Sequence, residues 1–176
     1  MLTVSLAACV TRAPLPTDAE YAVSGRVGAQ YTDPNNGRQE QIYGSFEWVE
    51  HNGTVDLTLI DPLGQAIARI VWSNATTSIT LRDGRRFQGN TPEDLTRRTL
   101  GWVLPLGGMK FWLRGRADKD AEIERDDAGR ITKLRQDNWI VRYNSARDDP
   151  PGRPSRIDLN YVGTGPEIAL KLIMDP

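Results

Sequence analysis

The feature that most constrains the fold is an alternation of apolar and polar residues with a period of two, repeated in short segments along most of the chain. In residues 21–31, Val23 and Val27 fall on one side, whereas Arg26 and Gln30 fall on the other. Successive side chains of a β-strand point to opposite faces of its sheet, so this pattern predicts a half-buried strand. Similar alternation, or a short apolar run, occurs at residues 41–50, 54–60, 65–73, 76–82, 85–89, 122–125, 130–136, 139–144, 156–161 and 167–174. The chain is therefore expected to contain about ten strands.

Turn-forming residues separate these segments at short intervals. Asn52-Gly53 turns the chain between two strands, and Asp83-Gly84 has the composition of a type I′ hairpin turn, in which both central residues adopt positive φ. The short, regular spacing predicts antiparallel strands that follow one another as a meander.

The strand pattern is interrupted once, between residues 91 and 115. Thr91 offers an N-cap hydroxyl and Pro92 suits the first helical position, so a helix is predicted to begin there and to end before Pro105. The apolar residues around Met109 predict a second short helical piece that ends at Gly115.

Together these elements predict a mainly β fold with a helical insertion, in which a curved antiparallel sheet or open barrel wraps around the helices as one domain over residues 21–176. Helices that fill only part of the concave side would leave an apolar pocket. Its expected lining is Phe46, Trp48, Leu57, Leu59, Trp112, Trp139 and Tyr143. The pattern supports equally well an ordinary closed core made of the same residues.

The composition limits the classes of function. The chain has 22 basic and 23 acidic residues, and its basic residues are scattered, which argues against nucleic-acid binding. One cysteine and a single histidine, His51, allow no internal disulfide and leave no set of metal ligands. The acidic pairs Asp126-Asp127 and Asp148-Asp149 leave open a hydrolase, but no motif for a nucleophile or a phosphate accompanies them. We expect a monomer that is not an enzyme and has no cofactor.

The N-terminus has the pattern of a lipid-attachment signal. Leu6-Ala7-Ala8-Cys9 places small residues directly before the only thiol, as a bacterial lipobox does. Residues 1–8 are therefore interpreted as the remnant of a signal peptide, and residues 9–20 as a lipidated, Pro- and Thr-containing tether. The alternative is a buried N-terminal strand with an incidental cysteine. No apolar run reaches the roughly 18 residues that a membrane-spanning helix needs.

One turn presents an apolar residue at its tip. In Asp61-Pro62-Leu63-Gly64, proline suits the first corner of a tight turn and glycine supplies permissive φ. In a membrane-anchored protein, a protruding Leu63 can enter the lipid, where full burial is worth about 1.5–3 kcal/mol. The alternative is a turn residue that folds back onto the core.

Several of these segments together resemble the LolB family of outer-membrane lipoprotein receptors. The resemblance covers residues 21–174 and rests on motifs that are weak singly and more specific in their order and spacing. These are Ser24-Gly25-Arg26-Val27, Gly44-Ser45-Phe46-Glu47-Trp48, Asp61-Pro62-Leu63-Gly64-Gln65, Gly101-Trp102-Val103-Leu104-Pro105-Leu106, Phe111-Trp112-Leu113-Arg114-Gly115 and Trp139-Ile140-Val141-Arg142-Tyr143. The family implies an unclosed antiparallel β-barrel (a half barrel) with helices over its concave side.

The resemblance also implies a function. The resemblance implies that this chain is anchored in the outer membrane through lipidated Cys9 and faces the periplasm. It also implies that the protein accepts acylated lipoproteins from the periplasmic carrier LolA and releases them into the inner leaflet. Leu63 stands at the position that the family uses for this last step, which makes it the expected membrane-inserting residue. Val10, where an Asp would favour retention in the inner membrane, permits export to the outer one. A second hypothesis keeps the fold but has the protein bind or sense a lipid or other hydrophobic ligand without transferring it.

Overall fold

The computed structural model describes residues 15–33, 36–144 and 153–176. They form eleven strands and two helices, which agrees with the expectation of about ten strands. Cys9, the signal remnant and residues 10–14 of the tether lie outside the described residues. The elements are β1 (Tyr21–Thr32), β2 (Gln39–His51), β3 (Thr54–Ile60), β4 (Ala66–Trp72), β5 (Thr77–Leu81), β6 (Arg86–Gly89), α1 (Pro92–Leu100), α2 (Leu106–Trp112), β7 (Glu122–Arg125), β8 (Ile131–Gln136), β9 (Trp139–Tyr143), β10 (Arg156–Tyr161) and β11 (Ile168–Met174).

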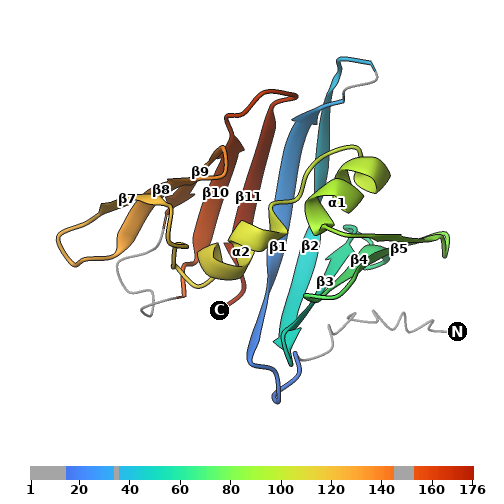
Figure 1. The fold of residues 1–176 in the computed structure, drawn as a ribbon, viewed down its shortest axis with the longest axis horizontal. Helices are drawn as coiled ribbons and strands as arrows, with labels where there is room; N and C mark the ends of the chain where they lie inside the picture. Colours follow the sequence, from blue (N-terminus) through green and yellow to red (C-terminus); the bar gives the residue numbers. More distant parts are fainter. Residues whose placement is uncertain (1–14, 34–35, 145–152) are drawn as a thin grey trace, which may run out of the picture.

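All strands belong to one antiparallel sheet in the order β6-β5-β4-β3-β2-β1-β11-β10-β9-β8-β7. The chain forms one meander before the helices and another after them, and the pairing of β1 with β11 joins the two. Strands β6 and β7 end the sheet and do not pair with each other, so the barrel is not closed. Figure 1 shows both helices on one side of the curved sheet. The predicted unclosed antiparallel barrel with a helical insertion is confirmed.

The hairpin turns follow local backbone chemistry. Asn52 and Gly53 both have positive φ, 49° and 70°, as a type I′ turn requires. The same prediction for Asp83-Gly84 was wrong, because Gly84 alone of that pair has positive φ. The amide of Gly84 donates to the carbonyl of Leu81, and the amide of Leu81 donates to the carbonyl of Arg85. This is a three-residue loop, in which glycine takes the left-handed position after an ordinary turn.

The first helix begins as predicted and ends earlier. The hydroxyl of Thr91 accepts a hydrogen bond from the amide of Asp94 at 3.3 Å, and Pro92 occupies the first turn. The helix stops at Gly101, whose φ of 83° forms a left-handed cap, rather than continuing to Pro105. Pro105 instead precedes α2, which begins at Leu106 and therefore starts before the Met109 cluster.

Two glycines allow strands to cross closely. A β-carbon on Gly25 of β1 would lie 2.2 Å from the carbonyl oxygen of Ile173, and one on Gly44 of β2 would lie 2.1 Å from that of Ile60. Both glycines point to the concave side in the alternation of their strands, where a side chain would collide with backbone. Gly25 therefore permits the β1–β11 pairing that unites the two meanders.

The core lies between the concave face of the sheet and the helices. Alternate residues of the central strands point inward and are buried, including Trp48 on β2, Leu57 on β3 and Leu170 on β11. Leu95 of α1 and Leu106 and Trp112 of α2 are buried against this face. The helical insertion is thus the second layer of the domain.

Candidate functional site

The turn between β3 and β4 carries the most exposed large apolar side chain of the described residues. Leu63 is 81% exposed, whereas the next such residue, Tyr43, is 62% exposed. Leu63 is therefore not folded back onto the core. Single exposed leucines are common, so exposure alone does not indicate a function for Leu63. The conformation of the turn that carries it must also be considered.

Asp61 fixes the conformation of this turn. Its carboxylate accepts hydrogen bonds from the backbone amides of Leu63 and Gln65, each at 2.9 Å, and pairs with the guanidinium of Arg82. The amide of Gly64 donates to the carbonyl of Asp61 at 3.0 Å, and Gly64 has a φ of 81°. The hydrogen bond from Gln65 and those from Arg82 and Leu63 hold the pKa of Asp61 below its ordinary value. The brace is thus charged and formed at neutral pH.

All seven residues predicted to line a cavity are buried, and two of them also border a groove. Trp112 and Trp139 lie on a groove of about 570 Å³ beside α2, together with Trp72, Val103, Phe111 and Tyr161. The other five are buried in the core and do not line this groove: Phe46, Trp48, Leu57, Leu59 and Tyr143. They can contact a ligand only if the helices move away from the sheet, so their role as a cavity lining stays a prediction.

The second helix is intrinsically weak. Its seven residues include Gly107 and Gly108, and each glycine costs a helix about 1 kcal/mol relative to alanine. The Trp112 side chain leaves no room for a larger residue at Gly108, where a β-carbon would lie 2.3 Å from the ring. The stability of α2 must therefore come from its contacts with the rest of the domain.

Several hydrogen bonds attach the end of α2 to the sheet. The hydroxyl of Tyr143 donates to the carbonyl of Trp112 at 3.1 Å, and burial raises the pKa of this hydroxyl. The indole N–H of Trp112 donates to Gln136 Oε1, also at 3.1 Å. On the other side, the hydroxyl of Tyr21 donates to the carbonyl of Leu113 at 2.9 Å.

A buried ion pair also joins this end of the helix to β2. Arg114 Nη1 lies 2.6 Å from Glu50 Oε1, which also accepts the indole N–H of Trp48 at 2.8 Å. The Arg114 guanidinium stacks 3.8 Å from the centre of the Tyr21 ring. Sequence reasoning did not single out this cluster. The available signal was the position of Glu50, which places a carboxylate on the same face of β2 as Phe46 and Trp48.

Other candidate sites receive no support from the geometry of the described residues. The Asp126 carboxylate accepts hydrogen bonds from the amides of Ala128 and Arg130, at 3.0 and 2.9 Å, and so stabilises a turn. The pair Asp148-Asp149 lies outside the described residues. Within the described part of the chain, no group of three His, Cys, Asp or Glu side chains could hold a metal ion, and neither helix is long and apolar enough to span a bilayer.

Comparisons of the sequence with known families and proteins agree with the resemblance noted above. The family model described as "Outer membrane lipoprotein LolB" matches residues 19–176. A relative named outer-membrane lipoprotein LolB from Cupriavidus pinatubonensis is 38% identical over 185 residues, which cover 97% of this chain and 88% of the relative. One of the same name from Cupriavidus metallidurans is 33% identical, covering 97% of this chain and 90% of the relative. The crystal structure of a LolA superfamily protein from Nitrosomonas europaea covers 88% of this chain and 84% of its own, with a TM-score of 0.48 and 11% identity.

Proposed function

This chain belongs to the LolB family of outer-membrane lipoproteins, and we propose that Leu63 is the residue through which it delivers other lipoproteins into the membrane. Membership makes the protein an outer-membrane lipoprotein receptor that handles acylated proteins. The proposal concerns its own residues and partners: lipid attachment at Cys9, acceptance of cargo from a LolA-like periplasmic carrier, a cavity beneath the helices, and insertion through Leu63.

The observation that carries the proposal is the exposure of Leu63 on a rigid turn. An apolar side chain held out into water by a braced backbone gains free energy when it enters lipid, about 1.5–3 kcal/mol if burial is complete. Because Asp61 already fixes the turn, insertion does not have to order the backbone first. The turn is thus suited to contact the inner leaflet while the body stays in the periplasm.

Cargo binding is proposed to displace the helices from the sheet. The groove beside α2, at about 570 Å³, lies within the size range of small-molecule sites. Its lining combines the rings of Trp112 and Trp139 with charged side chains such as Lys110 and Asp118. Helix α2 is short and glycine-rich, and polar contacts hold its C-terminal end. An acyl chain that enters the groove would break those contacts of α2. Burial of the chain would offset this loss by about 0.8 kcal/mol per methylene.

The test replaces Leu63 with glutamate and measures two steps separately. Leu63→Glu should accept a purified acylated lipoprotein from the carrier as the natural protein does, because the turn is remote from the core. Transfer of that lipoprotein into phospholipid vesicles should fall at least about tenfold, since the apolar group that enters the lipid is replaced by a charge.

Val162→Glu is the matched control. Val162 is 46% exposed in the turn after β10. Three strands lie between β10 and β3 in the sheet, so Val162→Glu adds the same charge far from the Leu63 turn. Unchanged transfer by Leu63→Glu, or an equal loss in Val162→Glu, would refute the role of Leu63. A natural protein that binds lipoprotein but never releases it to vesicles would instead support the ligand-holding alternative.

A further inference from the structure

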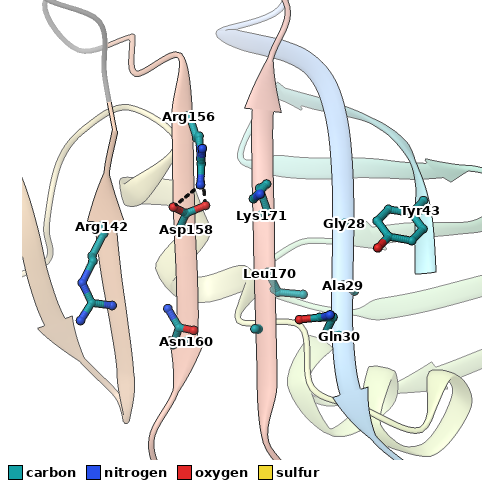
Figure 2. A pocket seen from close by; sticks show the side chains of 11 residues that line it. Gly28, Ala29, Gln30, Tyr43, Arg142, Arg156, Asp158, Asn160, Leu170 and Lys171 are labelled. Carbon is teal, nitrogen blue, oxygen red and sulfur yellow. Dashed lines mark hydrogen bonds and ion pairs between the residues drawn. The ribbon is translucent and has the colours of Figure 1, made fainter. Parts of the chain in front are cut away.

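A second groove lies on the convex face of the sheet, opposite the helices. It has a volume of about 400 Å³ and crosses β9, β10, β11, β1 and β2. Figure 2 views this face, with Arg142 and Lys171 on either side of Asp158 and Tyr43 beyond Gly28. None of the functional steps described above uses this groove.

The register of the strands aligns its central residues in one row. Arg142 on β9 is opposite Asp158 on β10, and Asp158 is opposite Lys171 on β11. Lys171 is in turn opposite Gly28 on β1, which is opposite Tyr43 on β2. Neighbouring strands lie about 4.8 Å apart, so the two cationic side chains arise about 10 Å from each other and can reach one ligand between them.

The charges in this row do not cancel. Asp158 is already paired with Arg156 through two hydrogen bonds of 3.1 and 2.9 Å, and it also accepts from the side-chain amide of Asn144. Arg142 and Lys171 have no acidic partner among the described residues. The groove therefore has two cationic groups available on either side of a neutralised ion pair, which favours an anionic ligand.

The far end of the row is shaped by a glycine and an aromatic ring. A β-carbon on Gly28 would lie 3.6 Å from the Tyr43 ring. Because Gly28 has no side chain, the space beside this ring is unfilled. Tyr43 is 62% exposed, and its hydroxyl donates to Gln41 Oε1 at 2.8 Å. An exposed tyrosine with an apolar ring and a polar tip is suited to the boundary between membrane and water.

The segment of β2 that carries Tyr43 lies next to the Leu63 turn. Strand β3 ends at Ile60, which is opposite Ser45, while β2 continues past Tyr43. A β-carbon on Gly44, the neighbour of Tyr43, would meet the backbone of Ile60 and lie 3.6 Å from the Cα of Asp61. The two most exposed large apolar side chains of the described residues, Leu63 and Tyr43, therefore belong to adjacent segments.

We infer that the convex groove binds the phosphate group of a membrane phospholipid, with Arg142 and Lys171 as its ligands and Tyr43 at the lipid boundary. This inference rests on the proposed function in one respect, that the Leu63 turn faces the membrane. A volume of about 400 Å³ suits a headgroup better than the flat surface typical of a protein partner. Headgroup binding would orient the body so that Leu63 points into the leaflet.

The test uses the full chain with Cys9→Ala, so that no anchor contributes to lipid binding. Its affinity is measured by calorimetry for three soluble probes: dicaproyl phosphatidylethanolamine below its micelle concentration, inorganic phosphate, and polyglutamate. We expect the phospholipid to bind most tightly. Arg142→Gln and Lys171→Gln should each weaken it about tenfold, as expected for loss of one charge-assisted hydrogen bond.

Arg86→Gln is the matched control, because Arg86 is an exposed cation on β6 at the other end of the sheet. It should leave phospholipid affinity within about twofold, whereas an effect as large as that of Arg142→Gln would refute a local site. Equal binding of inorganic phosphate would overturn the lipid assignment, and tighter binding of polyglutamate would assign the groove to an acidic protein instead. Headgroup binding needs no cargo transfer, so Leu63→Glu should leave it intact even if the delivery model fails.

Discussion

The buried pair Glu50–Arg114 permits a quantitative prediction. Glu50 is 4% exposed, and its side chain depends on Arg114 and on the indole of Trp48 for compensation of its charge. Arg114→Met keeps the aliphatic stem near Tyr21 but removes the guanidinium, which leaves a buried carboxylate with one neutral donor. Breaking a buried ion pair in this way typically costs about 3–5 kcal/mol. The Arg114 side chain is 21% exposed, so water can partly replace it and we expect a cost at the lower end of that range.

Urea unfolding followed by tryptophan fluorescence measures this cost. With a slope of about 2 kcal/mol per molar urea, the midpoint should fall by about 1.5 M in Arg114→Met. In the double variant Glu50→Gln/Arg114→Met no charge remains to be compensated, and the amide oxygen that replaces the carboxylate can still accept the indole N–H of Trp48. That variant should recover most of the loss and lie within about 1 kcal/mol of the natural protein.

Two results would refute this reasoning. A loss below about 1 kcal/mol in Arg114→Met would mean that solvent already screens the carboxylate of Glu50. A double variant as unstable as Arg114→Met would mean that the guanidinium acts through its stacking on Tyr21 and its hydrogen bond to Lys110 rather than through charge.

Three further predictions concern the sheet, the turn and the helices. Gly25→Ala should prevent folding or cost more than about 3 kcal/mol, because its β-carbon would overlap backbone, whereas Gly28→Ala, with 3.6 Å of space, should cost less than about 1 kcal/mol in the same urea assay. Because the folded-state pKa of Asp61 is lowered, its brace should persist as pH falls through the ordinary carboxyl range and be lost only at the lower value; amide NMR shifts of the turn that titrate at the ordinary value would contradict this. Gly89→Cys/Leu95→Cys should form a disulfide between β6 and α1, since the two β-carbons lie 3.5 Å apart, and oxidation should abolish cargo uptake until a reductant is added; uptake by the oxidised protein would show that α1 need not move.

The strands and the Leu63 turn could be predicted because their signals are local. Period-two alternation reports which residues of a strand are buried, and Pro62 with Gly64 specifies the turn whatever lies around it. Errors arose where two local signals competed. Gly101 ended α1 before Pro105 could, because a left-handed cap terminates a helix as effectively as proline does.

The candidate site was less accessible to sequence reasoning because it depends on contacts between distant segments. Nothing near Glu50 in the sequence indicates that Arg114, 64 residues later, neutralises it. The row from Arg142 to Tyr43 likewise requires the register of five strands, including the pairing of β1 with β11. Phe46, Trp48, Leu57 and Leu59 were identified as inward-facing, but alternation alone cannot distinguish a packed core from the wall of a cavity.

The unpaired edges at β6 and β7 have a mechanical consequence. In a closed barrel the circumference is fixed by strand number and stagger, so the interior can widen only if backbone hydrogen bonds break. Here the two halves meet along the β1–β11 seam, and the gap between β6 and β7 can change by bending about that seam while every ladder stays intact. If acyl groups bind beneath the helices as proposed, the volume available to them would be set by how far the sheet bends, and one scaffold could accept acyl groups of different length and number.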